Sequence, residues 1–215
     1  MEQGSPEWHA ARVGKVTGSR VCEVMARIKT GWGASRANYM AELIAERLTG
    51  VAAEKFTSGP MQWGSATEDE ARAAYQFETT TRVIKPGLDG SLAFVPHPTI
   101  AMAGASPDGY IGEHGLLEMK CPLTATHIET LLGGSVPSKY ILQMQFQMAC
   151  TGRKWCDFIS YDPRMPEHMR LFVRRVMRDG AAVPDLERHI REFLIELDHK
   201  LAQLRALYEP ERVAA

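Results

Sequence analysis

Hydrophobic residues recur along the chain with two spacings, and these spacings predict where helices and strands lie. Apolar residues three and four positions apart are typical of the buried face of a helix. We expect helices where this spacing holds, at 21–28, 35–49, 61–77, 124–132, 140–150 and 183–208. Hydroxyl side chains favour helix starts, so Thr17 or Ser19 is expected to cap the first helix and Ser35 the second.

Short apolar runs bounded by turn residues predict strands between these helices. Four such runs, early in the chain, would form a small sheet of about four strands, and two alternating segments follow later. The chain of 215 residues has no Pro/Ser-rich linker, which predicts one domain, 1–215. Predicted helices and strands alternate along the chain, which favours an α/β fold with a small mixed central sheet flanked by helices. The predicted strands are 79–84, 91–95, 100–105, 115–121, 154–161 and 169–177.

The formal net charge is −1, which excludes a protein that coats nucleic acid with a generally basic surface. Any DNA binding must be local, and the segment 8–40 is the place to look for phosphate contacts. An exposed positive face without a partner explains that segment equally well. Its basic residues are Arg12, Lys15, Arg20, Arg27, Lys29 and Arg36, and its only acid is Glu23.

The four cysteines show neither a CxxC pair nor zinc-like spacing. The sequence begins without a basic-then-apolar signal segment, and no apolar run approaches the length that spans a membrane. We therefore expect free thiols in a soluble cytoplasmic protein.

The stretch Gly104–Lys120 concentrates the candidate chemistry. Asp108 lies in a Pro-Asp-Gly turn, and Glu118, Met119 and Lys120 end an apolar run. Residues two apart in a strand share a face, roughly 6.6 Å apart, so Glu118 and Lys120 project together. Met119 then points into the core and leaves its carbonyl near the acids. Such hard oxygen ligands suit Mg²⁺ or Mn²⁺, and a neighbouring lysine stabilises charge on a phosphate under attack.

Each piece of this stretch also has an ordinary explanation. Pro-Asp-Gly is a common turn, and Glu-x-Lys on a strand is usually a solvated ion pair. The order and spacing of the two together resemble the PD-(D/E)xK signature of restriction-endonuclease-like nucleases. This resemblance implies a restriction-endonuclease-like core.

Two predicted helices and one helix start carry further candidates. Three successive acids, at 68–70, cannot all face one way at about 100° per residue, and from the residues alone a solvated face is favoured. Gln143 and Gln147 share one face of the helix 140–150, where glutamines are usually just solvated. Arg12 and the free N–H groups of the helix that follows it could together form a phosphate pocket. An ordinary capped helix with an exposed arginine explains the same residues equally well.

Five sequence blocks, in the same order, resemble phage lambda exonuclease and its relatives, the YqaJ-type viral recombinases. The similarity covers most of the chain and is weakest at 31–62 and near the C-terminus. The blocks are EWHAARVGKVTGS, WGSATEDEARAAYQFET, GASPDGYIGEHGLLEMKCP, SKYILQMQFQMA and YDPRM.

The resemblance implies roles at the catalytic centre. Asp108, Glu118 and the carbonyl of Met119 would bind two catalytic Mg²⁺ ions, with Mn²⁺ as a substitute. Lys120 would lie beside the attacking water. Glu68 matches the helical glutamate that completes the family's site, and Gln143 matches the residue that positions water or substrate.

The resemblance also implies DNA contacts. Arg12 and Ser19 fall where the family holds the 5′-phosphate of the recessed strand. Met61 matches an apolar wedge that parts the terminal base pairs, although the family has leucine there. Lys29 stands where the family has an arginine near the downstream DNA. No role follows for Tyr161–Met165.

The implied activity is two-metal hydrolysis that degrades the 5′-phosphorylated strand of duplex DNA from its end, 5′ to 3′. The 3′ single strand that remains would serve recombination by a single-strand annealing protein. Relatives form homotrimeric rings around DNA, and only the inner face of a ring need be basic. The expected setting is a bacterial host cytoplasm, with the gene in a phage or prophage.

Two rival interpretations remain. Another nuclease of the same fold, such as a junction resolvase or an iron–sulfur adaptation nuclease, is one, although the cysteine spacing does not supply a cluster. A non-catalytic DNA-end-binding recombination protein is the other. The intact Asp108, Glu118 and Lys120 argue against it.

Overall fold

A mixed five-stranded sheet lies at the centre of the computed structural model, which describes residues 1–53 and 59–208 without the side chains of Pro60, Met61 and Ser65. The strand order is β10-β9-β8-β7-β4. Strands β8 and β9 are parallel and the other neighbours antiparallel. The strands are β4 (Val83–Ile84), β7 (Gly109–Ile111), β8 (Gly115–Lys120), β9 (Trp155–Tyr161) and β10 (Leu171–Met177).

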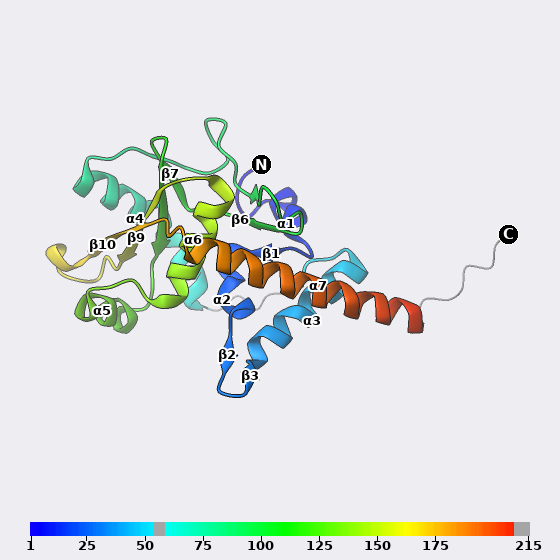
Figure 1. The fold of residues 1–215 in the computed structure, drawn as a ribbon. Coiled ribbons are helices and arrows are strands. Elements are labelled where there is room, and N and C mark those ends of the chain that lie inside the picture. The colour runs from blue at the N-terminus through cyan, green and yellow to red at the C-terminus, as the bar shows by residue number, and fades with distance from the viewer. Residues whose placement is uncertain (54–58, 209–215) are drawn as a thin grey trace.

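Strand β8 is buried on both faces, and its alternation assigns each side chain to a layer. Leu117 and Met119 pack with Tyr75 of helix α4 (Gly59–Thr79). Leu116 packs instead with Met144 and Met148 of helix α6 (Ser138–Thr151). The central sheet therefore lies between α4 and α6, as Figure 1 shows.

A second, larger core lies beside this layer. It contains the three-stranded sheet β1-β6-β5, formed by Val16–Thr17, Ala103–Ala105 and Val95–Pro96. Helices α3 (Ala34–Thr49) and α7 (Ala182–Tyr208) pack on it, with Leu43 and Phe193 among their buried residues. The remaining helices are α1 (Pro6–Arg12), η1 (Gly18–Arg20), α2 (Val21–Val24), α5 (Thr124–Gly133) and η2 (Glu167–Met169).

The α/β class and most helices agree with the expectations from sequence. Helices α3 to α7 and the late strands β9 and β10 lie within a few residues of their predicted ranges. The four cysteines are free thiols, as expected. Among the described residues, no helix is both long and apolar enough to cross a membrane.

The predicted helix 21–28 is wrong in its second half. Helix α2 ends at Val24, and Ile28 belongs to a hairpin of β2 (Arg27–Ile28) and β3 (Gly31–Trp32). The chain turns at Lys29 and Thr30, and strand β3 begins at Gly31, whose φ of 139° is open to glycine but strained for other residues. The guanidinium of Arg27 lies 4.1 Å from the centroid of the Trp32 ring and supports the hairpin.

The predicted caps are also wrong. Thr17 makes no capping bond through its side chain, and Arg20 is the N-cap of α2. Gly33 is the N-cap of α3, which places Ser35 inside the first turn. The Gly33 N–H donates instead to the Ala26 carbonyl, so the base of the β2–β3 hairpin sets where α3 begins.

The early strands are shorter than predicted and fall into two sheets. Strand β6 is in the three-stranded sheet, and the hairpin partner of β8 is β7, which begins inside the expected Pro-Asp-Gly turn. Glycine makes this possible because it has no Cβ. A Cβ at residue 109 would lie 2.5 Å from Val83 Cγ1 and would clash with it. The segment 79–84 contributes only β4, since α4 continues to Thr79.

Candidate active site

The β7–β8 hairpin brings together Asp108, Glu118 and Lys120. The Met119 N–H donates to Asp108 Oδ2 at 2.7 Å, and the Asp108 N–H donates to the Leu117 carbonyl at 3.2 Å. Lys120 Nζ lies 2.5 Å from Glu118 Oε1. The predicted alternation is correct, because Met119 is buried on the opposite face from Glu118 and Lys120.

Glu118 is fully buried, with 0% of its surface exposed. Two glutamines of α6 donate to its carboxylate: Gln143 Nε2 to Oε1 at 2.8 Å and Gln147 Nε2 to Oε2 at 2.6 Å. A buried carboxylate is costly unless it is paired and hydrogen-bonded. The two glutamines and Lys120 together supply partners for both oxygens of the Glu118 carboxylate.

The two acids and the lysine perturb one another. Burial, together with the charge of Glu118, raises the pKa of Asp108 to about 8, against the opposing effect of Lys120. Burial lowers the pKa of Lys120, but the charges of Glu118 and Asp108 outweigh it and raise that pKa above its usual value. Perturbed groups that face one another in this way are typical of functional sites.

Glu68 reaches this cluster from α4. Burial raises its pKa, and the nearby charges of Lys120 and Arg72 oppose that rise. Glu68 and Arg72 also line a cavity of about 180 Å³ with Lys85. Asp69 instead pairs with Arg72 and Lys85 and is largely exposed. Of the first two of these acids, Glu68 is the one that lies near Lys120, and its catalytic role stays a prediction.

The oxygen atoms at this site fit a hard divalent cation. No group of three His, Cys, Asp or Glu side chains in the described parts of the chain forms a ready metal cluster. The donors would be Asp108, Glu118, a backbone carbonyl and water, with Glu68 nearby, and Mg²⁺ commonly keeps waters in this way. Burial raises the pKa of Asp108 most and the charge of Glu118 adds to it, and a cation there would oppose both effects. The Met119 carbonyl as a ligand stays a prediction.

Arg12 approaches the cluster from helix α1. Its Nη1 donates to Ser106 Oγ at 2.8 Å, and its guanidinium carbon lies 3.9 Å from the centroid of the Trp8 ring. Trp8 Nε1 donates to the same hydroxyl at 3.0 Å. Burial lowers the pKa of Arg12 to about 10. Ser106, two residues before Asp108, was missed from sequence, although its place in the PD-(D/E)xK stretch offered a signal.

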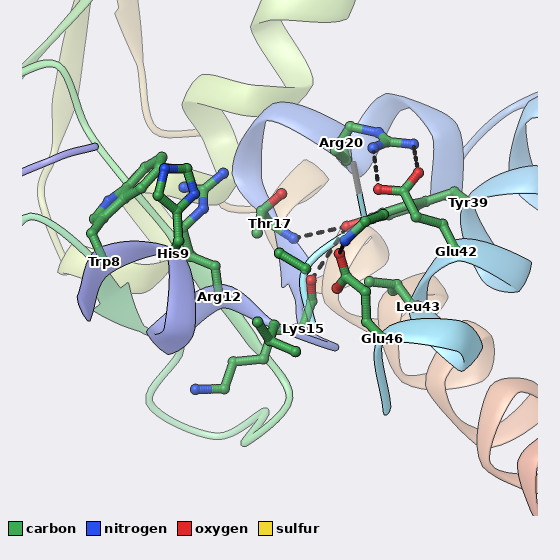
Figure 2. Close-up of a pocket in the computed structure, with 13 residues that line it drawn as sticks. Trp8, His9, Arg12, Lys15, Thr17, Arg20, Tyr39, Glu42, Leu43 and Glu46 are labelled. Atoms are coloured by element: carbon green, nitrogen blue, oxygen red, sulfur yellow. Dashed lines mark hydrogen bonds and ion pairs between the residues drawn. The ribbon is translucent and has the colours of Figure 1, made fainter. Parts of the chain in front are cut away.

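Arg12 also lines a cavity of about 360 Å³ between α1 and α3. Figure 2 shows Arg12 and His9 on one side of this space and Arg20, Tyr39 and Glu42 on the other. Arg20 is held by Glu42 at 2.9 Å. The lining of the cavity is mixed, with apolar side chains beside basic and acidic ones.

Of the three other predicted DNA-binding residues, Ser19 and Lys29 lie outside this cavity, and the side chain of Met61 is not described. Ser19 is exposed on η1 and is not among the residues that line the cavity. Lys29 is exposed at the turn of the β2–β3 hairpin, which projects far from β7 in Figure 1. Met61 is in α4, and its side chain is outside the described part of the structure.

The Tyr-Asp-Pro-Arg-Met segment, which had no predicted role, fastens the end of β9. Asp162 is buried, and it accepts bonds from Thr124 Oγ1 at 2.7 Å and from Arg164 Nε at 2.7 Å. Burial opposes ionisation, but the hydrogen bonds from Arg164 and Thr124 lower the pKa of Asp162 to about 2. The Arg164 guanidinium lies 4.6 Å from the centroid of the Trp63 ring. The segment thereby connects β9, α5 and α4.

The sheet flanked by helices, with Asp108, Glu118 and Lys120 on one hairpin, defines a restriction-endonuclease-like protein of the PD-(D/E)xK type. The family model of the YqaJ-like viral recombinase domain matches residues 7–154. The chain therefore belongs to the YqaJ-like viral recombinase family, the family of lambda exonuclease.

Solved structures agree with this assignment. The alkaline exonuclease LHK-Exo from Laribacter hongkongensis is 48% identical, with 94% of this chain and 97% of that chain covered and a TM-score of 0.85. Its complex with dAMP gives a TM-score of 0.86. A phage-related exonuclease from Haemophilus somnus 129PT, 14% identical over 88% of this chain and 96% of that chain, shares the fold with a TM-score of 0.69. No curated protein sequence matches the chain.

Proposed function

We propose that this protein is a 5′ to 3′ exonuclease of double-stranded DNA, which digests the 5′-phosphorylated strand and leaves a 3′ single strand for annealing recombination. The observation that carries the proposal is the convergence of Asp108, Glu118 and Lys120 beside the Arg12–Ser106 pair. The LHK-Exo relative has been crystallised with dAMP, a 5′ mononucleotide, which is the kind of product that this reaction releases.

Asp108, Glu118 and the Met119 carbonyl are the residues that would hold the metal ions, with Glu68 completing the site. Two Mg²⁺ ions, or Mn²⁺ in their place, would supply Lewis-acid chemistry at the water and at the leaving 3′-oxygen. Lys120, held in a charged state by the carboxylates, neutralises charge that develops on the phosphate. Gln143 donates to the Glu118 carboxylate and, by its match to the family, would help to position water or substrate.

The strand polarity follows from Arg12 and Ser106. A guanidinium that already donates to a hydroxyl can donate its remaining N–H groups to a terminal phosphate. A 5′-phosphate held there would fix how many nucleotides separate the strand end from the metals. Ser19 would join Arg12 as a ligand of the 5′-phosphate. Met61 would be the wedge that parts the terminal base pairs, and Lys29 would contact the downstream DNA.

A homotrimeric ring and a single-strand annealing partner complete the proposal. The ring would keep the enzyme on DNA between cuts, and the partner would take up the 3′ strand. Both rest on membership of the family.

Digestion of linear and covalently closed circular duplexes of the same sequence tests the proposal. With Mg²⁺, the linear DNA should be converted to mononucleotides while the closed circle stays intact, and chelator should stop the reaction. Nicking of the closed circle would instead indicate an endonuclease. No cleavage of either DNA, with retained binding to ends, would indicate a non-catalytic end-binding protein.

A further inference from the structure

Gln147 lies one helical turn after Gln143 on the same face of α6, and its side chain is fully buried. Residues four apart on a helix are neighbours, so both amides reach the same carboxylate. The two contacts are not equivalent. Gln143 and Lys120 both contact Glu118 Oε1. Among the described residues, Gln147 is the side chain that donates to Oε2, at a distance of 2.6 Å.

The bond to Glu118 sets the orientation of the Gln147 amide. A carboxylate oxygen accepts hydrogen bonds only, so the NH₂ group of Gln147 faces Glu118 Oε2 at 2.6 Å and the Ser106 carbonyl at 3.5 Å. The amide oxygen then faces Cys156 Sγ of strand β9, which lies 3.9 Å away and equally far from the Asp157 carbonyl oxygen. Burial raises the pKa of the Cys156 thiol well above its usual value, so the thiol keeps its proton.

This arrangement limits how the Glu118 carboxylate can rotate. With both oxygens held, the plane of the carboxylate is set by α6 and not by solvent, which cannot reach it. Loss of the Gln147 donor would leave Oε2 buried without a side-chain partner and free the carboxylate to turn. Groups that hydrogen-bond a metal ligand from behind commonly tune affinity in this way.

We propose that Gln147 is a positioning residue of the metal site, which holds Glu118 Oε2 and thereby sets the affinity of the site for divalent cations. The inference rests on the proposed function, because it assumes that Glu118 is a metal ligand. Gln147 acts through Glu118 and need not touch the metal or the DNA.

The test compares Gln147→Met with Gln145→Met. Gln145 is a matched control, because it is buried on the same helix but bonds the backbone of Met177 and Asp179, away from Glu118. Mn²⁺ binding to the full chain without DNA, measured by electron paramagnetic resonance, reports the site independently of cleavage. Gln147→Met should weaken binding about 10- to 100-fold, as loss of such partners does elsewhere, and Gln145→Met should leave it unchanged.

A kinetic readout separates positioning from general damage. The Mg²⁺ concentration for half-maximal digestion should rise in Gln147→Met, with the rate largely restored at saturating Mg²⁺. If Gln147→Met does not fold, Gln147→Asn keeps a buried amide but withdraws it from Glu118, and it should show the same rise.

The outcomes distinguish the inference from the proposed function. If the unmodified protein binds no Mn²⁺, the metal-dependent function itself fails. If it binds Mn²⁺ and Gln147→Met binds equally well, the positioning role is overturned and the function stands. Equal losses in Gln147→Met and Gln145→Met would trace the effect to the packing of α6, which also overturns the inference.

Discussion

Replacement of Arg12 by alanine should remove most of the preference for 5′-phosphorylated ends. Arg12 is partly buried, carries its charge beside Ser106, and is anchored by its hydrogen bond to Ser106 and by the Trp8 ring. A hydrogen bond between charged groups contributes about 1.5–3 kcal/mol, and about 1.4 kcal/mol corresponds to a factor of ten. We therefore expect kcat/KM on 5′-phosphorylated duplex to fall about 10- to 150-fold.

The 5′-hydroxyl end supplies the internal comparison. It offers no phosphate to Arg12, so Arg12→Ala should digest hydroxyl ends almost as fast as the unmodified protein does. Lys15→Ala is a matched control, because Lys15 lines the same cavity but donates to the Ala11 carbonyl. Initial rates on end-labelled duplexes measure each case. An equal fall on both kinds of end would remove Arg12 from the phosphate pocket.

The remaining predictions concern the catalytic cluster and the segment after β9. Lys120→Met should slow cleavage about 10²- to 10³-fold, with DNA-end binding retained in gel-shift assays; unchanged cleavage would refute the site. The pKa of Asp108 is about 8 when folded and about 3.9 when unfolded, so in chelator this group lowers stability as pH rises through that interval. Asp108→Asn should flatten the fall in Tm between about pH 4 and pH 8, and an unchanged slope would contradict this. The pKa of Asp162 is lowered to about 2, so its stabilising effect is present above about pH 4 and lost as pH falls toward 2. Asp162→Ala should reduce the free energy of unfolding by about 1–3 kcal/mol in urea titrations at pH 7, and no change would refute the fastening role.

Local periodicity was enough to predict which side chains of β8 share a face. Glu118 and Lys120 project together and Met119 is buried, as the alternation required. Strand β7 could not be predicted in the same way, because its first residue is the glycine of a Pro-Asp-Gly turn. The turn continues as a strand because β7 pairs with β8 and β4, which are distant partners that the local pattern does not reveal.

Contacts between distant segments account for the rest. The pairing of Arg12 with Ser106 joins residues 94 positions apart, and the bond between Gln147 and Glu118 joins residues 29 positions apart. From sequence, Gln147 was most simply a solvated helix residue, because amphipathic spacing does not show what a helix face packs against. The family resemblance pointed to Glu68 and Gln143, for which residue patterns alone favoured a solvated face. In the structure Glu68 lies near Lys120 and Gln143 donates to Glu118, while their catalytic roles stay predictions.

The most direct test of the account is digestion of a linear duplex with a 5′-phosphate on one strand and a 5′-hydroxyl on the other, with Mg²⁺ and with chelator. The account predicts selective, Mg²⁺-dependent conversion of the phosphorylated strand to mononucleotides, with the opposite strand left intact. Loss of nucleotides from the 3′ ends, or equal digestion of both strands, would contradict the assignment of polarity to the Arg12–Ser106 pocket.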